Sequence, residues 1–222
     1  MYIKFGQQIA TVQVLPPQYG IFRKLYDDAP SVSYDEVQDC LQQEFGTRNA
    51  TEIFTQFDPK PIASASIAQV HRATLPDGTA VAVKIQKPQI RKQMEWDLAM
   101  YRVLSLGMEW LFDLPLAYFT GYVQEHLRRE LDFLQEGRNA ERAASDFKGS
   151  SVQDLVHIPK VYWPYTTKRI LTCEWIDGIR MTDMQAIRSC GVSVESILKT
   201  IVDAFSHQIF YTGFVHASFI TL

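Results

Sequence analysis

The chain has 222 residues, of which 46% are hydrophobic and 21% are charged, which is enough to bury the core of one domain. Its 22 Lys and Arg residues against 25 Asp and Glu residues give a formal net charge of −3. No basic stripe is present, so we expect no nucleic-acid partner. The three cysteines, Cys40, Cys173 and Cys190, form no CxxC pair, which argues against a disulfide framework or a zinc site and for a reducing compartment.

The first section, residues 1–52, is predicted to be helical. Ser33-Tyr34-Asp35-Glu36 is a capping-box sequence, in which the Ser and Glu side chains satisfy backbone N–H groups at a helix start. The helix after it carries Val37 and Leu41 on one face, and Gly46 ends it.

The run from Pro61 to Lys84 is the most informative part of the sequence. Ala63, Ser64, Ala65 and Ser66 form a loop of small residues, where a backbone could lie close to a phosphate. Two alternating strand patterns follow, over residues 68–75 and 79–86. They are separated by Asp77-Gly78, a strong hairpin signal.

Lys84 is the candidate phosphate-binding residue of this hairpin. Val81 and Val83 fall on one face of the second strand, so Lys84 lies on the opposite face of the sheet. A Val-Ala-Val-Lys strand after a small-residue loop is similar to the phosphate-gripping strand of protein kinases. The alternative is an ordinary hairpin with a solvated lysine.

Residues 120–147 are predicted to form one helix, with an apolar stripe that includes Leu131. Asp132 and Glu136 are four residues apart and share a face of this helix. Taken alone, Glu130, Asp132 and Glu136 would be surface acids among neighbouring arginines.

Further predicted elements follow in the rest of the chain. A strand over residues 169–175 ends at a turn, a short helix covers residues 184–189, and a long amphipathic helix from Val194 ends near Gly213. The apolar stretch 103–119 contains Glu109, Asp113 and Pro115, which favours an amphipathic surface segment over a membrane span.

Several of these motifs occur together in a known order. Lys4-Phe5-Gly6-Gln7 matches a KxGQ motif, Ala63–Ser66 an alanine-rich loop, Lys84 the kinase lysine, and Glu130-Leu131-Asp132 an ExD motif. In this combination the chain resembles the UbiB-like atypical kinases, also called the aarF-domain kinases. The resemblance extends from residue 2 to about His216.

The resemblance implies an α+β fold. Residues 1–52 would be an N-terminal helical extension that packs over the nucleotide pocket. Residues 53–177 would form a protein-kinase-like small lobe, with an antiparallel sheet and helices, and residues 178–222 the incomplete start of a helical large lobe.

The resemblance also implies the site. Glu136 would pair with Lys84, because a lysine near phosphates must be held extended by a fixed carboxylate. Glu130 and Asp132 would lie nearer the triphosphate and metal, coupled to Lys4 and Gln7. Backbone groups of Glu174 and Ile176, at the hinge between lobes, would meet the adenine edge.

The expected cofactor is ATP, with Mg in full-length relatives, and the expected activity is of the ATPase type. The family's link to ubiquinone and mitochondrial lipid metabolism makes a mitochondrial location expected, although no targeting segment is visible at Met1. A membrane surface or a lipid is a further expected partner. The sequence indicates no oligomeric state.

The chain departs from the family pattern after Ala217. An Asp-Pro segment with a following Asn, which carries the catalytic and metal-binding groups, would come next, but the sequence reads Ser218-Phe219-Ile220-Thr221-Leu222. We therefore expect a truncated, catalytically incompetent domain with weak or lost ATP binding. The alternatives are a non-catalytic interaction or lipid-associated scaffold, and a chain without a stable fold of its own.

Overall fold

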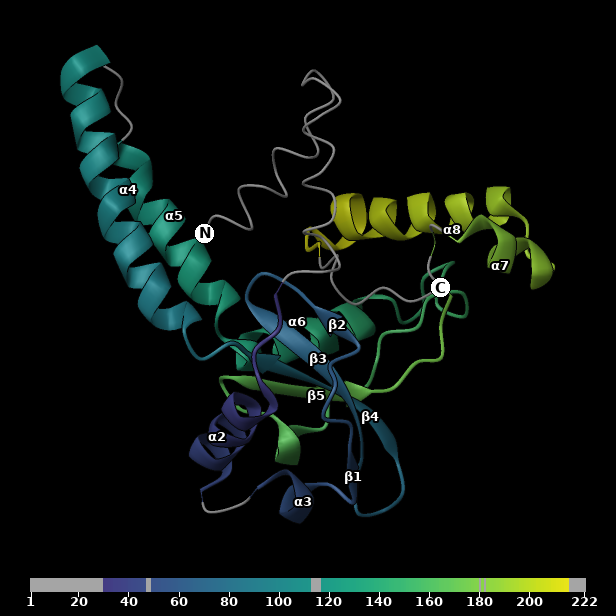
Figure 1. Ribbon diagram of the computed structural model, residues 1–222. Helices are drawn as coiled ribbons and strands as arrows, with labels where there is room; N and C mark the ends of the chain where they lie inside the picture. Colours follow the sequence, from purple (N-terminus) through teal and green to yellow (C-terminus); the bar gives the residue numbers. More distant parts are fainter. Residues whose placement is uncertain (1–29, 47–48, 113–116, 180, 182, 216–222) are drawn as a thin grey trace.

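The computed structural model describes residues 30–46, 49–112, 117–179, 181 and 183–215, and an antiparallel sheet lies at its centre (Figure 1). The strand order is β1-β3-β4-β5, and β2 also pairs with β3. The strands are β1 (Gln56–Phe57), β2 (Ala63–Ser64), β3 (Ala68–Thr74), β4 (Ala80–Gln86) and β5 (Ile170–Glu174).

The predicted hairpin is confirmed as β3 and β4. The turn is closed by two hydrogen bonds, from Gly78 N–H to Leu75 O and from Leu75 N–H to Thr79 O, both 2.9 Å long. Gly78 has a φ of +87°, a value that glycine adopts without the steric cost that a Cβ would add. This is the three-residue hairpin loop in which a left-handed residue follows a β-turn.

The two faces of the sheet pack against different helices, in agreement with the alternation of side chains along β4. Helices α2 (Tyr34–Phe45) and α3 (Ala50–Ile53) cover the face that carries Val81 and Val83, both 0% exposed. Helix α6 (Phe133–Asp146) covers the other face. The capping box is confirmed at α2, where Ser33 Oγ accepts from Glu36 N–H. Because α2 and α3 share a core with the sheet, the helices of residues 34–53 are part of this layered unit.

The prediction of a single helix over residues 120–147 is wrong, because this range contains the end of one helix and the whole of a second. Helix α5 (Ala117–Glu130) ends before Leu131, and Asp132 is the N-cap of α6. The chain turns because Leu131 and Phe133 are both buried, 8% and 0% exposed, and Phe133 N–H donates to Lys168 O beside β5. A continuous helix could not place both side chains in the core and still start α6 on the sheet.

Helices α4 (Ile90–Phe112) and α5 lie side by side as a hairpin that extends away from the sheet (Figure 1). None of the helices in the described ranges is long and apolar enough to cross a membrane.

The predicted C-terminal helices are confirmed. Helix α7 (Met184–Ser189) is followed by Gly191, and α8 (Val194–Ser206) continues as the π-helix η3 (His207–Thr212) up to Gly213, which has a φ of +66°. A short 3-10 turn, η2 (Trp163–Tyr165), precedes β5.

Candidate nucleotide site

Lys84 and Glu136 meet across the face of the sheet that α6 covers. Lys84 Nζ lies 2.6 Å from Glu136 Oε1, and the two side chains are 27% and 16% exposed. The ammonium also lies 4.8 Å from the centre of the Phe133 ring. The predicted lysine–acid pair is therefore formed, with the lysine directed toward the inner face of α6.

The start of α6 fixes where Glu136 lies. Asp132 Oδ1 accepts from Leu134 N–H at 3.1 Å and caps the helix, which sets Glu136 in its first turn. The side chain of Phe133 then packs with Leu171 of β5 and Ala68 of β3. Packing on two strands of the sheet holds the helix close enough for the ion pair.

The alanine-rich segment is only partly a loop. Ala63 and Ser64 form β2, which pairs with β3, so the loop proper is Ala65 to Ile67. Ala65 N–H donates to Ala68 O at 2.8 Å and closes this loop. The N–H of Ser66, which is only partly buried, has no acceptor within the described structure. The N–H of Ile67 has none there either, so these two amides are the loop groups that can donate to a phosphate.

Sequence reasoning missed the residues that tie this loop to the segment before α2. Lys87 Nζ donates to Pro30 O at 2.7 Å and to Ala65 O at 2.5 Å. The side-chain amide of Gln69 pairs with both backbone groups of Val32. No local pattern marks Lys87, because it follows the strand that ends at Gln86 and resembles a surface lysine.

His71 completes that tie on the same face as Gln69. The ring is 0% exposed, its Nδ1 lies 2.8 Å from Asp58 O, and its Nε2 lies 2.9 Å from Gln69 Nε2. Burial lowers the pKa of His71 from its ordinary value, against the opposing effect of the Asp58 carbonyl. Such a ring is neutral at neutral pH and serves packing.

The predicted hinge follows β5. Glu174 N–H donates to Lys160 O at 2.8 Å, so the amide predicted to meet adenine is already engaged, and its carbonyl is the group left for a ligand. The Glu174 carboxylate accepts from His157 and from Lys160 N–H. Ile176 follows in an irregular segment, where it is half-buried.

Cys173 lies next to the ion pair. Burial raises the pKa of its thiol to about 12, with a further upward contribution from Glu136 and an opposing one from Lys84. Cys40 and Cys190 are also unpaired with any other cysteine. Cys173 is therefore a buried packing residue of this cluster and is poorly suited to act as a nucleophile.

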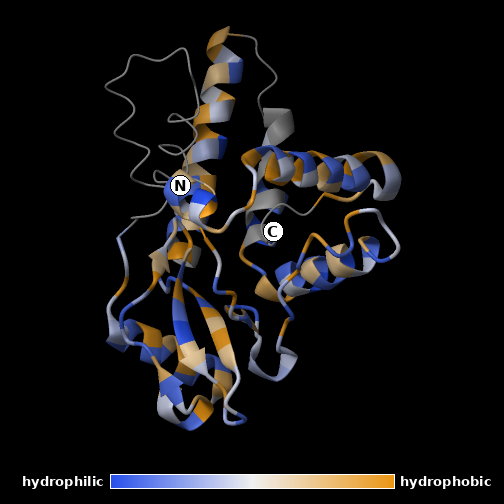
Figure 2. Cartoon of the chain, turned by 90° about the vertical axis from the view of Figure 1, so that its right-hand side faces the viewer, coloured by the Kyte–Doolittle hydropathy of each residue, from blue (hydrophilic) through white to orange (hydrophobic). Residues whose placement is uncertain are grey.

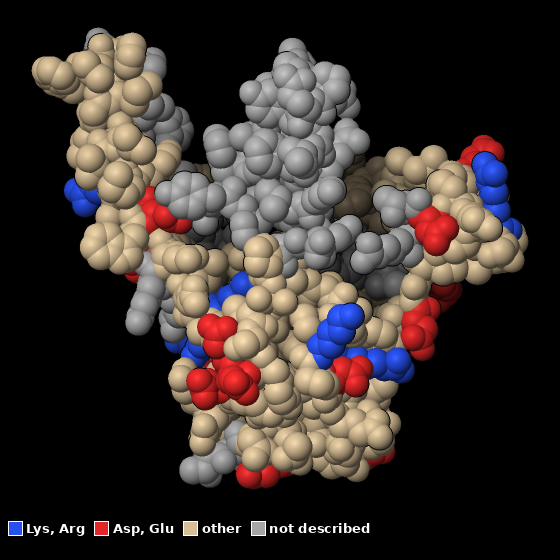
Figure 3. Space-filling model, in the orientation of Figure 1, with Lys and Arg blue, Asp and Glu red and all other residues tan. Residues whose placement is uncertain are grey.

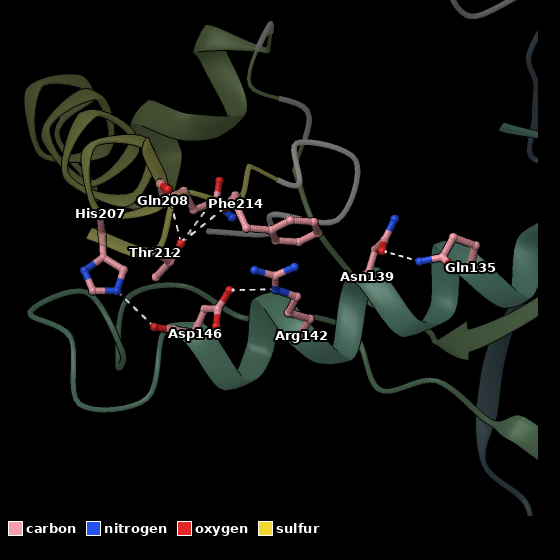
Figure 4. Close-up of polar contacts among 8 residues, drawn as sticks. All are labelled: Gln135, Asn139, Arg142, Asp146, His207, Gln208, Thr212 and Phe214. Atoms are coloured by element: carbon pink, nitrogen blue, oxygen red, sulfur yellow. Dashed lines mark hydrogen bonds and ion pairs between the residues drawn. The ribbon is translucent and has the colours of Figure 1, made fainter. Parts of the chain in front are cut away.

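The far end of α6 contacts the C-terminal helices (Figure 4). His207 of η3 lies 2.9 Å from Asp146 O, and Arg142 lies 3.6 Å from Asp146 Oδ2 with its guanidinium 4.0 Å from the centre of the Phe214 ring. The helix that carries Glu136 is thus linked at its other end to the segment that leads to Ala217.

The remaining predicted site residues are placed as follows. Lys4 and Gln7 lie outside the described residues. Glu130 is the last residue of α5, two positions before the capping Asp132. Within the described ranges no three His, Cys, Asp or Glu side chains gather as a metal site. The described residues thus supply the lysine–acid pair and the loop, and no cluster that would hold Mg.

Comparison with known proteins identifies this arrangement. The sequence model of the ABC1 atypical kinase-like domain matches residues 24–219. An ABC1 family protein of Schizosaccharomyces pombe is 41% identical over 220 residues, which are 97% of this chain and 41% of that protein. AarF domain-containing protein kinase 1 of Gallus gallus is 34% identical over 97% of this chain and 41% of its own length.

A probable serine/threonine-protein kinase of Dictyostelium discoideum is 39% identical over 97% of this chain and 31% of its own length. Among solved structures, Rv3197 of Mycobacterium tuberculosis in complex with erythromycin matches with a TM-score of 0.54 and 29% identity, over 81% of this chain and 45% of that one. The chain thus spans less than half the length of these relatives. Its α+β fold contains a protein-kinase-like small lobe, and the chain belongs to the ABC1 atypical kinase-like family.

Proposed function

We propose that this chain binds an adenine nucleotide on the face of the sheet that carries Lys84. The observation that carries the proposal is the 2.6 Å contact between Lys84 and Glu136, whose positions are 52 residues apart in sequence. A surface lysine gains little from such a pair. A half-buried pair beside a small-residue loop is the arrangement that holds a lysine toward phosphates.

Three groups would make the contacts. The Lys84 ammonium meets the phosphates, the Ser66 N–H donates to a phosphate oxygen, and the Glu174 carbonyl accepts from the adenine amino group. Alanine and serine cost more than glycine where a backbone must approach a ligand closely, so this loop wraps phosphates less completely than a glycine-rich one. We therefore expect weak binding of ATP and ADP.

We further propose that the 222-residue polypeptide does not turn ATP over. Phosphoryl transfer needs metal-held phosphates and a group that positions the acceptor. No Asp-Pro-x-x-x-Asn run occurs in the printed sequence, and Asp58-Pro59 is followed by Ala63 where that Asn would stand. When bound, Mg would supply charge neutralisation of the phosphates.

Calorimetric titration of the purified polypeptide with ATP and ADP tests the binding proposal. Glu136→Gln and Lys84→Met should each weaken ATP binding at least about tenfold, since each removes the group that grips or holds the phosphate contact. The matched control is Asp203→Asn, which breaks the Lys199–Asp203 pair, also 2.6 Å long but exposed on α8. Wild-type protein without affinity for either nucleotide would refute the proposal, as would equal losses in all three variants.

A second candidate function is that of a lipid-associated module, and one observation favours it. Helix α4 exposes a run of large apolar side chains, and its far half has only Arg102 and Glu109 as charged residues. Figure 2 shows repeated orange bands along this end of α4, between blue and pale ones, and in Figure 3 the described upper part of the hairpin shows neither acidic nor basic colour. The exposed residues include Trp96, Met100, Val103, Leu104, Trp110 and Leu111.

We propose that this face of α4 lies on a bilayer surface, since an apolar helix face with aromatic side chains inserts at the headgroup boundary. Co-sedimentation with anionic vesicles should capture the wild type, and Trp96→Glu with Trp110→Glu should reduce the bound fraction about tenfold. Leu155→Glu, an exposed apolar position outside α4, is the control. Equal binding of all three proteins, or no binding by the wild type, would refute this candidate.

On family membership alone we propose a mitochondrial location and a role linked to ubiquinone or mitochondrial lipids. Fractionation of cells that express the natural gene with a C-terminal tag tests the location. Recovery of the tagged protein outside mitochondria would contradict it.

A further inference from the structure

Lys87 is a buried cation at the base of the alanine-rich loop. It is 7% exposed, and its two acceptors, Pro30 O and Ala65 O, are main-chain carbonyls. It forms no ion pair with any residue that the structure describes. Burial lowers the pKa of its amine. A lysine buried without a carboxylate costs free energy.

The contacts of Lys87 involve Pro30 O, which also accepts from Ser64 Oγ at 3.3 Å. The same carbonyl therefore binds both Lys87 and the strand that leads into the loop. Lys87 N–H donates to Ile67 O at 3.0 Å, which ties the other end of the loop to the same residue. Lys87 therefore contacts both ends of the loop, Ala65 through its side chain and Ile67 through its backbone N–H. Its side chain also connects the loop to Pro30, in the segment before α2.

The contact with Ala65 acts on the Ser66 amide, which the proposed function assigns to a phosphate oxygen. Ala65 C=O and Ser66 N–H belong to one peptide group, and Ser66 N–H, like Ile67 N–H, has no acceptor among the described residues. An ammonium on the carbonyl oxygen polarises the peptide and strengthens its N–H as a donor. The positive charge is also favourable to a phosphate at that amide.

We propose that Lys87 is a positioning residue for nucleotide phosphates, which it serves by holding and polarising the Ala65–Ser66 peptide. The inference rests on the proposed nucleotide binding and adds a residue to that site. It predicts a specific signature: the effect of Lys87 grows with the number of phosphates on the ligand, because the group acts at the loop and not at the adenine pocket.

Calorimetric titration of the full 222-residue polypeptide with ATP, ADP and adenosine tests this signature. Lys87→Met should weaken ATP binding about tenfold, weaken ADP binding less, and change adenosine binding by less than about twofold. Lys87→Arg should retain ATP affinity within about threefold, since it keeps the charge and the donors. Lys60→Met, an exposed lysine of the same lobe, should match the wild type.

Hydrogen exchange without nucleotide gives an independent reading. In Lys87→Met, exchange should rise in residues 30–33 and 63–67 and stay unchanged in β4. If Lys87→Met does not fold, Lys87→Gln, which keeps a donor without the charge, serves for the same comparison.

The outcomes separate the two proposals. A wild type that binds none of the three ligands overturns the proposed function and this inference with it. Nucleotide binding that Lys87→Met leaves unchanged overturns the inference alone. An equal loss for ATP and adenosine also overturns it, because it assigns Lys87 a purely structural role.

Discussion

Trp163 packs against Gly137 so closely that a Cβ on this glycine would lie 3.0 Å from Cη2 of the indole and 3.4 Å from Val161 Cγ1. The indole is held in place, because Trp163 Nε1 donates to Glu141 Oε1 at 2.6 Å. Gly137 directly follows Glu136 on α6. Because Gly137 has no side chain, α6, which carries Glu136, can lie close to Trp163 and Val161.

We predict that Gly137→Ala lowers the free energy of unfolding by about 1 kcal/mol and weakens ATP binding. Overpacking costs about 1–3 kcal/mol and exceeds the gain in helix propensity of about 1 kcal/mol. Gly107→Ala on α4 is the matched control, since nothing lies within 4 Å of its added Cβ, and it should stabilise the protein. Urea unfolding measures both. A stabilised Gly137→Ala would show that the indole gives way.

The second prediction concerns Asp132, which caps α6 through Oδ1. Asp132→Ala should lower the free energy of unfolding by about 1 kcal/mol, because the Leu134 N–H loses its acceptor. Asp132→Asn retains a cap and should cost less than about 0.5 kcal/mol.

ATP titration with and without Mg separates the cap of Asp132 from the metal-side role that the family resemblance implies. Asp132→Asn should weaken binding only when Mg is present. If Asp132→Asn binds ATP as tightly as the wild type both with and without Mg, Asp132 acts only as a helix cap.

The third prediction is a pH dependence from His71. The pKa of the folded state lies below the ordinary value of 6.5, so between these two values the unfolded chain binds more protons. Stability contributed by the neutral ring is thus complete above pH 6.5 and is lost as the pH falls toward the folded pKa. Thermal melts from pH 7.5 to 5 should show a falling Tm.

His71→Asn should flatten that slope, although it lowers Tm at pH 7.5. A slope that persists in His71→Asn would assign the acid sensitivity to other groups.

The fourth prediction concerns Gln208 of η3, whose side chain is 0% exposed and has no hydrogen-bond partner at Oε1 or Nε2 among the residues that the structure describes. Burying an unpaired amide costs about 1–3 kcal/mol. Gln208→Met should therefore raise the free energy of unfolding by about 1 kcal/mol. Gln185→Met, at an exposed position of α7, should change it by less than about 0.5 kcal/mol. A destabilised Gln208→Met would mean that the amide is paired in solution.

Short-range signals in the sequence predicted much of the fold. Ser33 starts α2 and Gly213 follows η3, because a capping hydroxyl and a left-handed glycine act on neighbouring backbone groups. Asp77-Gly78 sets the hairpin for the same reason, and the alternation along β4 predicted that Lys84 lies on the face of the sheet opposite Val81 and Val83. The acid opposite Lys84 came from the family resemblance, and the structure confirms it as Glu136.

Long-range contacts decided the rest. The apolar stripe around Leu131 fits one continuous helix, yet the chain breaks there because Leu131 and Phe133 are buried at different places in the core. Periodicity records which face of a helix is apolar, and it does not record when two parts of that face have different partners. Likewise, Lys87 became a buried tie only when Pro30 and Ala65, 57 and 22 residues away in sequence, met at its ammonium.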